Sequence, residues 1–201
     1  MRVVLASASP RRKALLAALG IPVEVRVSHA PEVDHGHDPE SIVTANARVK
    51  RDAVLPGVEG GAVVVAADTL VFLDGEVLSK PADHAEARDM LRRLSGRTHE
   101  VVTGLAVANT AADRAAEGSE TTHVTFRDLS DDEIARFVEV VNPVDRAGAY
   151  TVDGPGSLLV ARYGGCFQNV LGLPIVRLDL LLRETGVRLF DLIRPELARF
   201  L

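Results

Sequence analysis

The chain has 201 residues, of which 47% are hydrophobic, so it is long enough to bury a substantial core. A net charge of −5 and the lack of tryptophan argue against broad nucleic-acid binding, which needs a basic face and stacking side chains. Cys166 is the only cysteine, which excludes an intramolecular disulfide and favours a cytoplasmic location. No apolar run reaches the roughly 18 residues that cross a bilayer, so we expect no membrane association.

Helix-like and strand-like segments alternate along the chain without repeats or a long linker, which predicts one α/β domain over residues 1–201. Ser9 before Pro10 and Asp38 before Pro39 each combine an N-cap with a first-turn proline, which predicts two helix starts. In the first half we expect a strand over residues 3–6, a helix from 10 to about 19, a strand over 23–27, a helix from 39 to about 54, and a strand over 62–67, with residues 69–73 as a candidate continuation of it.

The second half contains two capping-box patterns, Asp83 with Glu86 and Ser130 with Glu133. They predict a helix ending before Gly96 and a second helix reaching about residue 141. The other expected elements are strands over 98–108 and 121–127 joined by a polar loop, a hairpin of strands 157–160 and 167–170, a helix from 174 to about 183, and a short helix over 195–201.

The first candidate site is the predicted helix start at Ser9. Arg11, Arg12 and Lys13 follow this N-cap directly, at the positive end of the helix dipole. Each cation there costs about 0.3–1 kcal/mol, whereas a bound phosphate would unite the dipole, the backbone N–H groups and the guanidinium groups in one anion site. The alternative is a solvated basic helix end.

The second candidate is Asp68, which lies where the buried run 62–67 breaks. We interpret this position as the carboxyl end of a strand, where open α/β sheets bind ligands, and the carboxylate there suits a metal ligand or a general base. The alternative is a carboxylate that caps a turn at Thr69. Glu32 and Asp34 are either surface charges or further oxygen ligands, and oxygen-only coordination suits Mg²⁺ or Mn²⁺.

Three more cations are candidates for phosphate binding. Lys50 shares a helical face with Val43 and Ala47, so its ammonium is expected either to enter a cleft or to extend into solvent. Lys80 precedes a proline and Arg97 follows a glycine, and both are expected in turns that face phosphate oxygens.

Motifs of several other enzyme classes are absent from the sequence. It has no Walker A sequence, no G-x-S-x-G elbow and no G-x-G-x-x-G, so neither a kinase nor a serine hydrolase is indicated. His35 and His37 lack the spacing of two helical zinc ligands, and we expect no structural metal site there.

Six short motifs stand out in chain order: Leu5-Ala6-Ser7-Ala8-Ser9-Pro10-Arg11-Arg12-Lys13, Ala66-Ala67-Asp68-Thr69, Ser79-Lys80-Pro81, Ser95-Gly96-Arg97-Thr98-His99, Gly148-Ala149-Tyr150 and Asn169-Val170-Leu171-Gly172-Leu173-Pro174. Together they resemble the Maf family from residue 3 to about residue 185. The resemblance implies a nucleoside triphosphate pyrophosphatase with a twisted mixed β-sheet flanked by helices and a deep central cleft, similar to inosine-triphosphate pyrophosphatases. The roles it implies are housecleaning and septum control.

The resemblance also implies roles for individual residues. Asp68 matches the family's proton acceptor, and the matching polar cleft residues are Ser7, Arg11, Arg12, Glu32, Lys50 and Lys80. Our hypothesis is that Asp68 and Glu32 hold Mg²⁺ or Mn²⁺ while the cations neutralise the triphosphate.

Three positions are expected to set the base preference. They are Arg11, Thr69 and Asp153. In having a threonine at position 69, the chain resembles the branch that prefers thymidine and uridine triphosphates. The branch that prefers methylguanosine triphosphates is implied to have a glutamine there. At the position of Asp153, the resemblance implies a glutamine in the first branch and a glutamate in the second, so Asp153 departs from both. A carboxylate only accepts hydrogen bonds, so it favours a base edge that offers N–H donors.

Two other functions use the same cleft. A nucleotide-sensing regulator of cell division would bind a triphosphate without turnover, and a non-specific phosphatase would release inorganic phosphate. The Asp68 region lacks the second aspartate of an aspartyl-phosphate enzyme, which weighs against the phosphatase. A homodimer is a further expectation, which light scattering at micromolar concentration would test.

Overall fold

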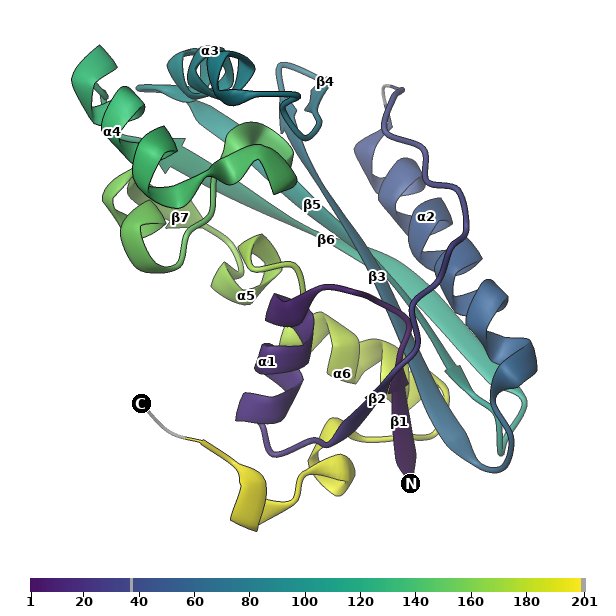
Figure 1. Cartoon of the computed structure of the whole chain (residues 1–201). Helices are drawn as coiled ribbons and strands as arrows, with labels where there is room; N and C mark the ends of the chain where they lie inside the picture. Colours follow the sequence, from purple (N-terminus) through teal and green to yellow (C-terminus); the bar gives the residue numbers. More distant parts are fainter. Residues whose placement is uncertain (37, 200–201) are drawn as a thin grey trace.

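The computed structural model describes residues 1–36 and 38–199 and shows a seven-stranded mixed sheet with helices on both faces (Figure 1). The strand order is β2-β1-β3-β5-β6-β7, with β4 beside β3. The strands are β1 (Arg2–Leu5), β2 (Val23–Val25), β3 (Ala62–Leu73), β4 (Glu76–Leu78), β5 (Thr98–Asn109), β6 (Arg114–Phe126) and β7 (Val160–Gly164). The predicted α/β class is confirmed.

The helices are α1 (Pro10–Ala18), α2 (Pro39–Val54), α3 (His84–Leu94), α4 (Asp131–Val141), α5 (Phe167–Val170) and α6 (Ile175–Glu184). Short 3-10 helices lie between or after them: η1 (Leu55–Gly57), η2 (Pro143–Asp145), η3 (Ala147–Ala149), η4 (Gly154–Leu158), η5 (Leu189–Leu192) and η6 (Pro195–Leu197). Within the described chain, no helix is long and apolar enough to cross a membrane.

The predicted helix caps are confirmed. Ser9 accepts a hydrogen bond from the Arg12 backbone N–H at the start of α1, and Asp38 caps α2. Asp83 caps α3, and Ser130 forms the reciprocal capping box of α4. Local side-chain chemistry therefore specifies where each of these helices begins.

Two lobes with separate cores share the long strands β3, β5 and β6, which run diagonally through both in Figure 1. We call them the lower lobe, where β1, β2, α1 and α6 cover one end of these strands, and the upper lobe, where β4, α3, α4 and β7 cover the other. Leu16 and Leu178 belong to the lower core, and Leu91 and Ile134 to the upper core. Helix α2 packs on the opposite face of the sheet, against β3 and β5.

A gap in the sheet lies beside the middle of β3. On this side β3 pairs with β1 through residues 62–65 and with β4 through residues 71–73. Residues 66–70 between them have no strand neighbour there among residues 1–36 and 38–199, although β5 pairs with β3 along the other side. Asp68 is therefore in the middle of a continuous strand, and our expectation that it ends a strand is wrong. The break in the apolar pattern instead marks the place where the neighbouring strand changes.

Three other expectations also need correction. Residues 114–120 form the first half of β6, not a polar loop, because they pair with β5. The expected hairpin of strands 157–160 and 167–170 is wrong: the first segment overlaps η4, β7 pairs with β6, and the second segment is α5. Only residues 195–197 of the expected last helix are helical, whereas residues 200 and 201, like His37, lie outside the described residues.

Candidate active site

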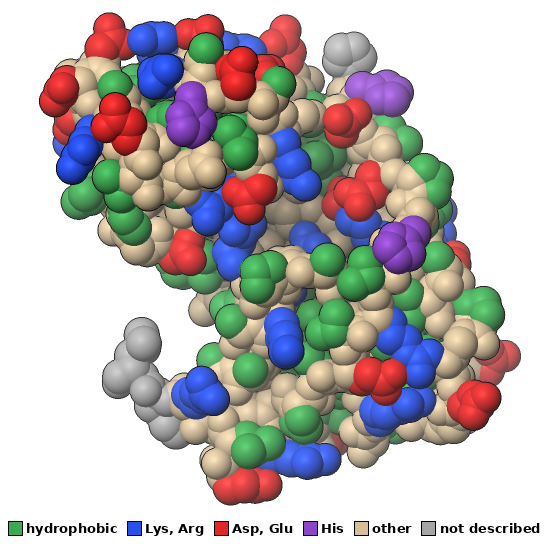
Figure 2. Space-filling view, in the orientation of Figure 1, with side chains coloured by type: hydrophobic (Ala, Val, Ile, Leu, Met, Phe, Trp, Pro, Cys, Tyr) green, Lys and Arg blue, Asp and Glu red, His purple; other side chains and the backbone are tan. Residues whose placement is uncertain are grey.

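A cleft of about 700 Å³ separates the two lobes at the gap beside β3. Figure 2 shows a hollow between the upper and lower parts of the molecule, with Lys and Arg side chains gathered around it. Both lobes contribute to its lining, which includes Ser7, Arg11, Asp68, Lys80, Arg146 and Tyr150. The deep cleft expected from the resemblance is present.

Asp68 lies at the centre of the cleft and is 5% exposed. Its Oδ1 accepts a hydrogen bond from Lys50 Nζ at 2.7 Å, and its Oδ2 accepts one from Asn46 Nδ2 at 2.8 Å. Burial alone would raise the pKa of Asp68, but the charge and hydrogen bond of Lys50, with Asn46, hold it below the ordinary value. The carboxylate is therefore ionised at neutral pH.

Lys50 extends from α2 into the cleft and is 8% exposed, so the alternative of a side chain that extends into solvent is wrong. Its ammonium lies 2.7 Å from Asp68 Oδ1 and 3.0 Å from Glu32 Oε1. Asn46 precedes Lys50 by one helical turn, which places both side chains over the same carboxylate. One face of α2 thus fixes the orientation of Asp68.

Glu32 and Asp34 both line the cleft from the loop after β2. Glu32 approaches Lys50, whereas Asp34 accepts a hydrogen bond from Ser79 Oγ at 3.2 Å across the cleft. Among the residues that the structure describes, no three His, Cys, Asp or Glu side chains are grouped to hold a metal ion. Glu32 and Asp68 alone are a fitting donor set for Mg²⁺, which commonly binds one or two carboxylates together with substrate phosphates and water.

Arg12 is buried at the start of α1 and bonds to three separate segments. Its Nε donates to Gly172 O at 2.8 Å, Nη1 to Ser7 Oγ at 3.1 Å, and Nη2 to Thr69 Oγ1 at 2.9 Å. Burial lowers the pKa of Arg12, and the charge of Asp68 opposes this shift. The guanidinium thus ties α1, β3 and the segment after α5 together.

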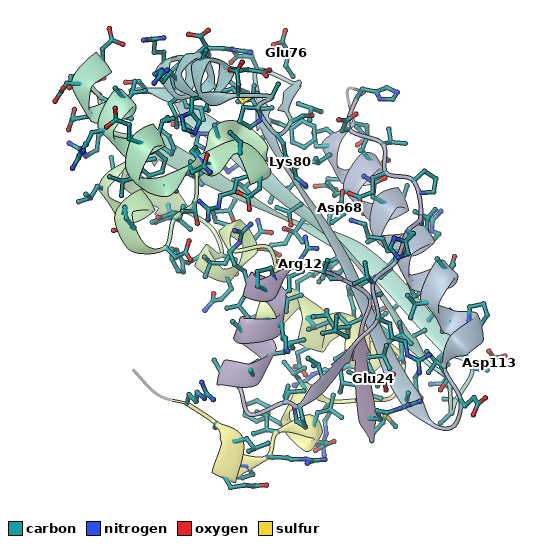
Figure 3. All side chains as sticks on the ribbon, in the orientation of Figure 1. Arg12, Glu24, Asp68, Glu76, Lys80 and Asp113 are labelled. Carbon is teal, nitrogen blue, oxygen red and sulfur yellow. The ribbon has the colours of Figure 1, made fainter. Side chains whose placement is uncertain are left out.

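Two predicted phosphate ligands stand at opposite rims of the cleft. Arg11 lines it from the lower lobe and Lys80 from the upper lobe. Within the described chain, neither side chain forms an ion pair or a hydrogen bond. Figure 3 shows Arg12 and Lys80 on either side of Asp68, whereas Asp113 lies far from the cleft. Both rims therefore offer positive charge to a bound anion.

The other predicted residues differ in their placement. Thr69 lines the cleft, but its hydroxyl bonds to Arg12 and lies 2.9 Å from the Thr103 hydroxyl. Asp153 is exposed, is not part of the lining, and accepts a hydrogen bond from Thr151. Arg97 bonds to the exposed Asp74 outside the cleft, so the expectation that it faces phosphate is wrong.

An apolar part of the cleft is formed mainly by the upper lobe and the segment after α5. Its lining includes Val71, Val101, Tyr150, Val152 and Leu171. Tyr150 is fixed by a 2.7 Å hydrogen bond between its hydroxyl and His99 Nε2. These walls suit the faces of a planar base.

Sequence analysis missed one residue that lines the cleft, Arg146, and two that hydrogen-bond to lining residues, Asn46 and His99. Asn46 could have been found from its one-turn spacing to Lys50 on the apolar face of α2. Arg146 lines the cleft, and the only local signal is its place just before the Gly148-Ala149-Tyr150 motif. His99 lies within a motif that we identified, but its contact with Tyr150 joins residues 51 positions apart.

Comparison with protein families gives a direct assignment. A family model described as Maf-like protein matches residues 2–185. The chain belongs to the Maf family. The match covers β1 through α6, and therefore every element that lines the cleft.

Curated relatives of this Maf-family chain match over nearly its full length. A protein of Bacillus velezensis named dTTP/UTP pyrophosphatase is 45% identical over 93% of this chain and 98% of its own. One of Moorella thermoacetica with the same name is 47% identical over 92% of this chain and 96% of its own. A solved dITP/XTP pyrophosphatase of Mycobacterium abscessus is 19% identical, with a TM-score of 0.43 over 64% of this chain and 76% of that chain.

Proposed function

We propose that this protein hydrolyses nucleoside triphosphates between the α- and β-phosphates, releasing a nucleoside monophosphate and pyrophosphate. The observation that carries the proposal is the buried Asp68 carboxylate, held by Lys50 and Asn46 inside a cleft with cations on both rims. The name dTTP/UTP pyrophosphatase, carried by relatives that are 45% and 47% identical to this chain, supports the same activity.

The cations of the cleft bind the triphosphate. Arg11 and Lys80 are free to contact phosphate oxygens from opposite rims, and the N-terminus of α1 adds its dipole and backbone N–H groups. The buried Arg12 guanidinium contributes a fixed positive charge beside them. Fixed charges stabilise the negative charge that builds up on the departing pyrophosphate without having to reorganise during the reaction.

Asp68 accepts a proton from the attacking water. The water oxygen forms a bond to the α-phosphorus, the bond to the bridging oxygen of the β-phosphate breaks, and the water proton passes to Asp68. A phosphate oxygen that draws the Lys50 ammonium toward itself weakens the 2.7 Å contact that holds the pKa of Asp68 down. Binding of the nucleotide thereby makes Asp68 a better proton acceptor.

Glu32 and Asp68 would hold a divalent cation, Mg²⁺ or Mn²⁺. Both carboxylates approach the same Lys50 ammonium, so they converge on one region of the cleft. Such a cation supplies charge neutralisation at phosphate oxygens. Lys50, when displaced from the carboxylates, remains available to the phosphates.

Thymine and uracil nucleotides are the proposed substrates. Thr69 matches the branch with this preference, and the curated relatives carry the corresponding name. Asp153, the residue that departs from the family pattern, is exposed and outside the cleft lining. Its carboxylate is therefore only a weak argument against a preference for thymine and uracil. Arg11 and Thr69 border the cleft directly.

The test is a panel of ordinary and modified nucleoside triphosphates with Mg²⁺ or Mn²⁺, in which pyrophosphate and phosphate are measured separately. We expect pyrophosphate with dTTP and UTP and a loss of about 10²–10⁴-fold in Asp68→Asn. Asp113→Asn is the matched control, because Asp113 lies in a turn far from the cleft. Tight nucleotide binding without pyrophosphate release would contradict the proposed pyrophosphatase activity and favour the function of a nucleotide-sensing regulator.

A further inference from the structure

Arg146 is a cation of the cleft with unused hydrogen-bond donors. It lies between η2 and η3 in the upper lobe and lines the cleft. Its Nε and Nη1 are both buried, and neither has a hydrogen-bond partner in the described part of the chain. A buried donor without a partner costs about 1–3 kcal/mol, and more when the group is charged. For Nε and Nη1 to meet a ligand the side chain, which is 23% exposed, has to turn toward the cleft, and the missing hydrogen bonds favour this movement.

The neighbouring carboxylate does not satisfy this guanidinium. Asp145 Oδ1 lies 3.7 Å from Arg146 Nε, beyond hydrogen-bond distance, and the Asp145 side chain is 73% exposed. Arg12, by contrast, donates from all three of its nitrogens to protein oxygens. Arg12 and Arg146 thus differ in how much of their hydrogen-bonding capacity is free.

The backbone that carries Arg146 is held rigidly. Gly148 N–H donates to Ser79 O at 3.2 Å, and Ala149 N–H donates to Arg146 O at 3.0 Å. Gly148 and Ala149 both have positive φ, 70° and 59°, which for a buried alanine is a strained conformation. The first of these bonds ties the turn to the residue before Lys80, so Lys80 and Arg146, which both line the cleft from the upper lobe, are carried by connected segments of backbone.

We propose that Arg146 binds the phosphate groups that leave as pyrophosphate, gripping them from the upper lobe. The proposal rests on the proposed function for the identity of the ligand. Nε and one Nη of a guanidinium form a fork that matches two oxygens of one phosphate, and burial strengthens such charge-assisted bonds. With Arg11 on the lower rim, Arg146 and Lys80 then hold the phosphates from both lobes.

Inorganic pyrophosphate is the probe, with binding measured by calorimetry in the presence and absence of Mg²⁺. We expect Arg146→Met to weaken pyrophosphate binding about 10- to 100-fold, as for the loss of a charge-assisted hydrogen bond. Arg146→Lys keeps the charge but not the fork, so it should fall between Arg146→Met and the wild type. Binding of thymidine monophosphate should change less than threefold or so in both variants.

Arg136→Met is the matched control, because Arg136 belongs to the same lobe and its side chain is 75% exposed. Its pyrophosphate affinity should equal that of the wild type. Thermal unfolding of each variant separates misfolding from lost contacts, and Arg146→Lys serves if Arg146→Met does not fold. Unchanged pyrophosphate affinity in the folded variants would overturn the proposal, as would a loss confined to thymidine monophosphate, which would place Arg146 at the base.

Pyrophosphate binding and the triphosphate panel, measured on the same variants, distinguish the failure of one proposal from the failure of the other. A wild-type protein that binds pyrophosphate through Arg146 but releases none from any triphosphate would overturn the proposed function and support the role of Arg146. If the wild type releases pyrophosphate from triphosphates but the Arg146 variants bind pyrophosphate as tightly as the wild type, the proposed function is supported and the role of Arg146 is overturned.

Discussion

The two walls of the cleft differ in how far their polar groups are already paired. On the lower side, Arg12 is bonded to three partners, and the buried Asp68 is held by Lys50 and Asn46. On the upper side, Lys80 has no polar partner within the described chain, and Arg146 has two buried nitrogens without one. The difference teaches that Arg12 and Asp68 have their geometry before a ligand arrives, whereas Lys80 and Arg146, like Arg11 on the lower rim, have donors left for a ligand.

The largest expected effect comes from Lys50→Met, which removes the partner that holds the lower wall together. It leaves the buried Asp68 carboxylate without its ammonium, and breaking a buried pair in this way costs about 3–5 kcal/mol. Chemical denaturation should show this loss. The double variant with Asp68→Asn should recover part of the stability and none of the turnover, and additive losses would contradict the pairing.

Arg12→Met should have the next largest effect. Three hydrogen bonds to Ser7, Thr69 and Gly172 disappear, so we expect a loss of about 2–3 kcal/mol in the free energy of unfolding. Arg11→Met is the control, because this neighbour is unpaired and should change stability by less than about 0.5 kcal/mol while still weakening nucleotide binding. Equal losses of stability in the two variants would refute the contrast between them.

Acid should destabilise the upper lobe before it affects Asp68. Burial lowers the pKa of His99 from 6.5 to about 4, so the unfolded chain takes up a proton more readily than the native protein. The stability that neutral His99 contributes is complete above the unfolded value and is lost as the pH falls toward the folded value, by about 3 kcal/mol in total. His99→Gln should remove this slope in unfolding measured between pH 7 and 4.5.

Asp68 also loses its contribution to stability as the pH falls, but in a lower pH window than His99. Its pKa in the folded protein is lowered below 3.8, so its contribution is complete above that value and is lost only at lower pH. If His99→Gln left the slope above pH 4.5 unchanged, another group would be responsible for the acid sensitivity.

Arg97→Ala should have the smallest effect. Among the residues that the structure describes, its only ion pair is with the exposed Asp74, outside both walls of the cleft, and such pairs contribute about 0–1 kcal/mol. Turnover should stay within about twofold of the wild type, because the side chain does not line the cleft. A large fall in turnover would show that Arg97 does reach the nucleotide.

Much of the fold follows from signals a few residues long. The N-caps Ser9, Asp38, Asp83 and Ser130 mark helix starts correctly, because capping involves atoms within one turn. The hairpin expected around Gly164 is wrong, because nothing local to that segment shows that it pairs with β6, some 40 residues earlier.

The candidate site divides in the same way. The motifs at Ser7 to Lys13, at Asp68 and at Lys80 are visible as short patterns of residue type, and all of these residues except Lys13 do line one cleft. Local patterns do not predict how these side chains pair. Arg12 donates a hydrogen bond to Gly172, 160 positions away, and Lys50 donates one to Asp68 from a different element. Such contacts depend on how the lobes pack, and that is set by the whole core.

Residue types and their local spacing suffice for the α/β class, the helix starts and the family resemblance, because each rests on short-range chemistry. The three-dimensional arrangement alone reveals the gap beside the middle of β3, where β1 has ended and β4 has not yet begun. It also distinguishes the paired Arg12 from the unsatisfied Arg146, which are the same residue type in the sequence. Whether a charged group is paired depends on neighbours far along the chain, which only folding brings together.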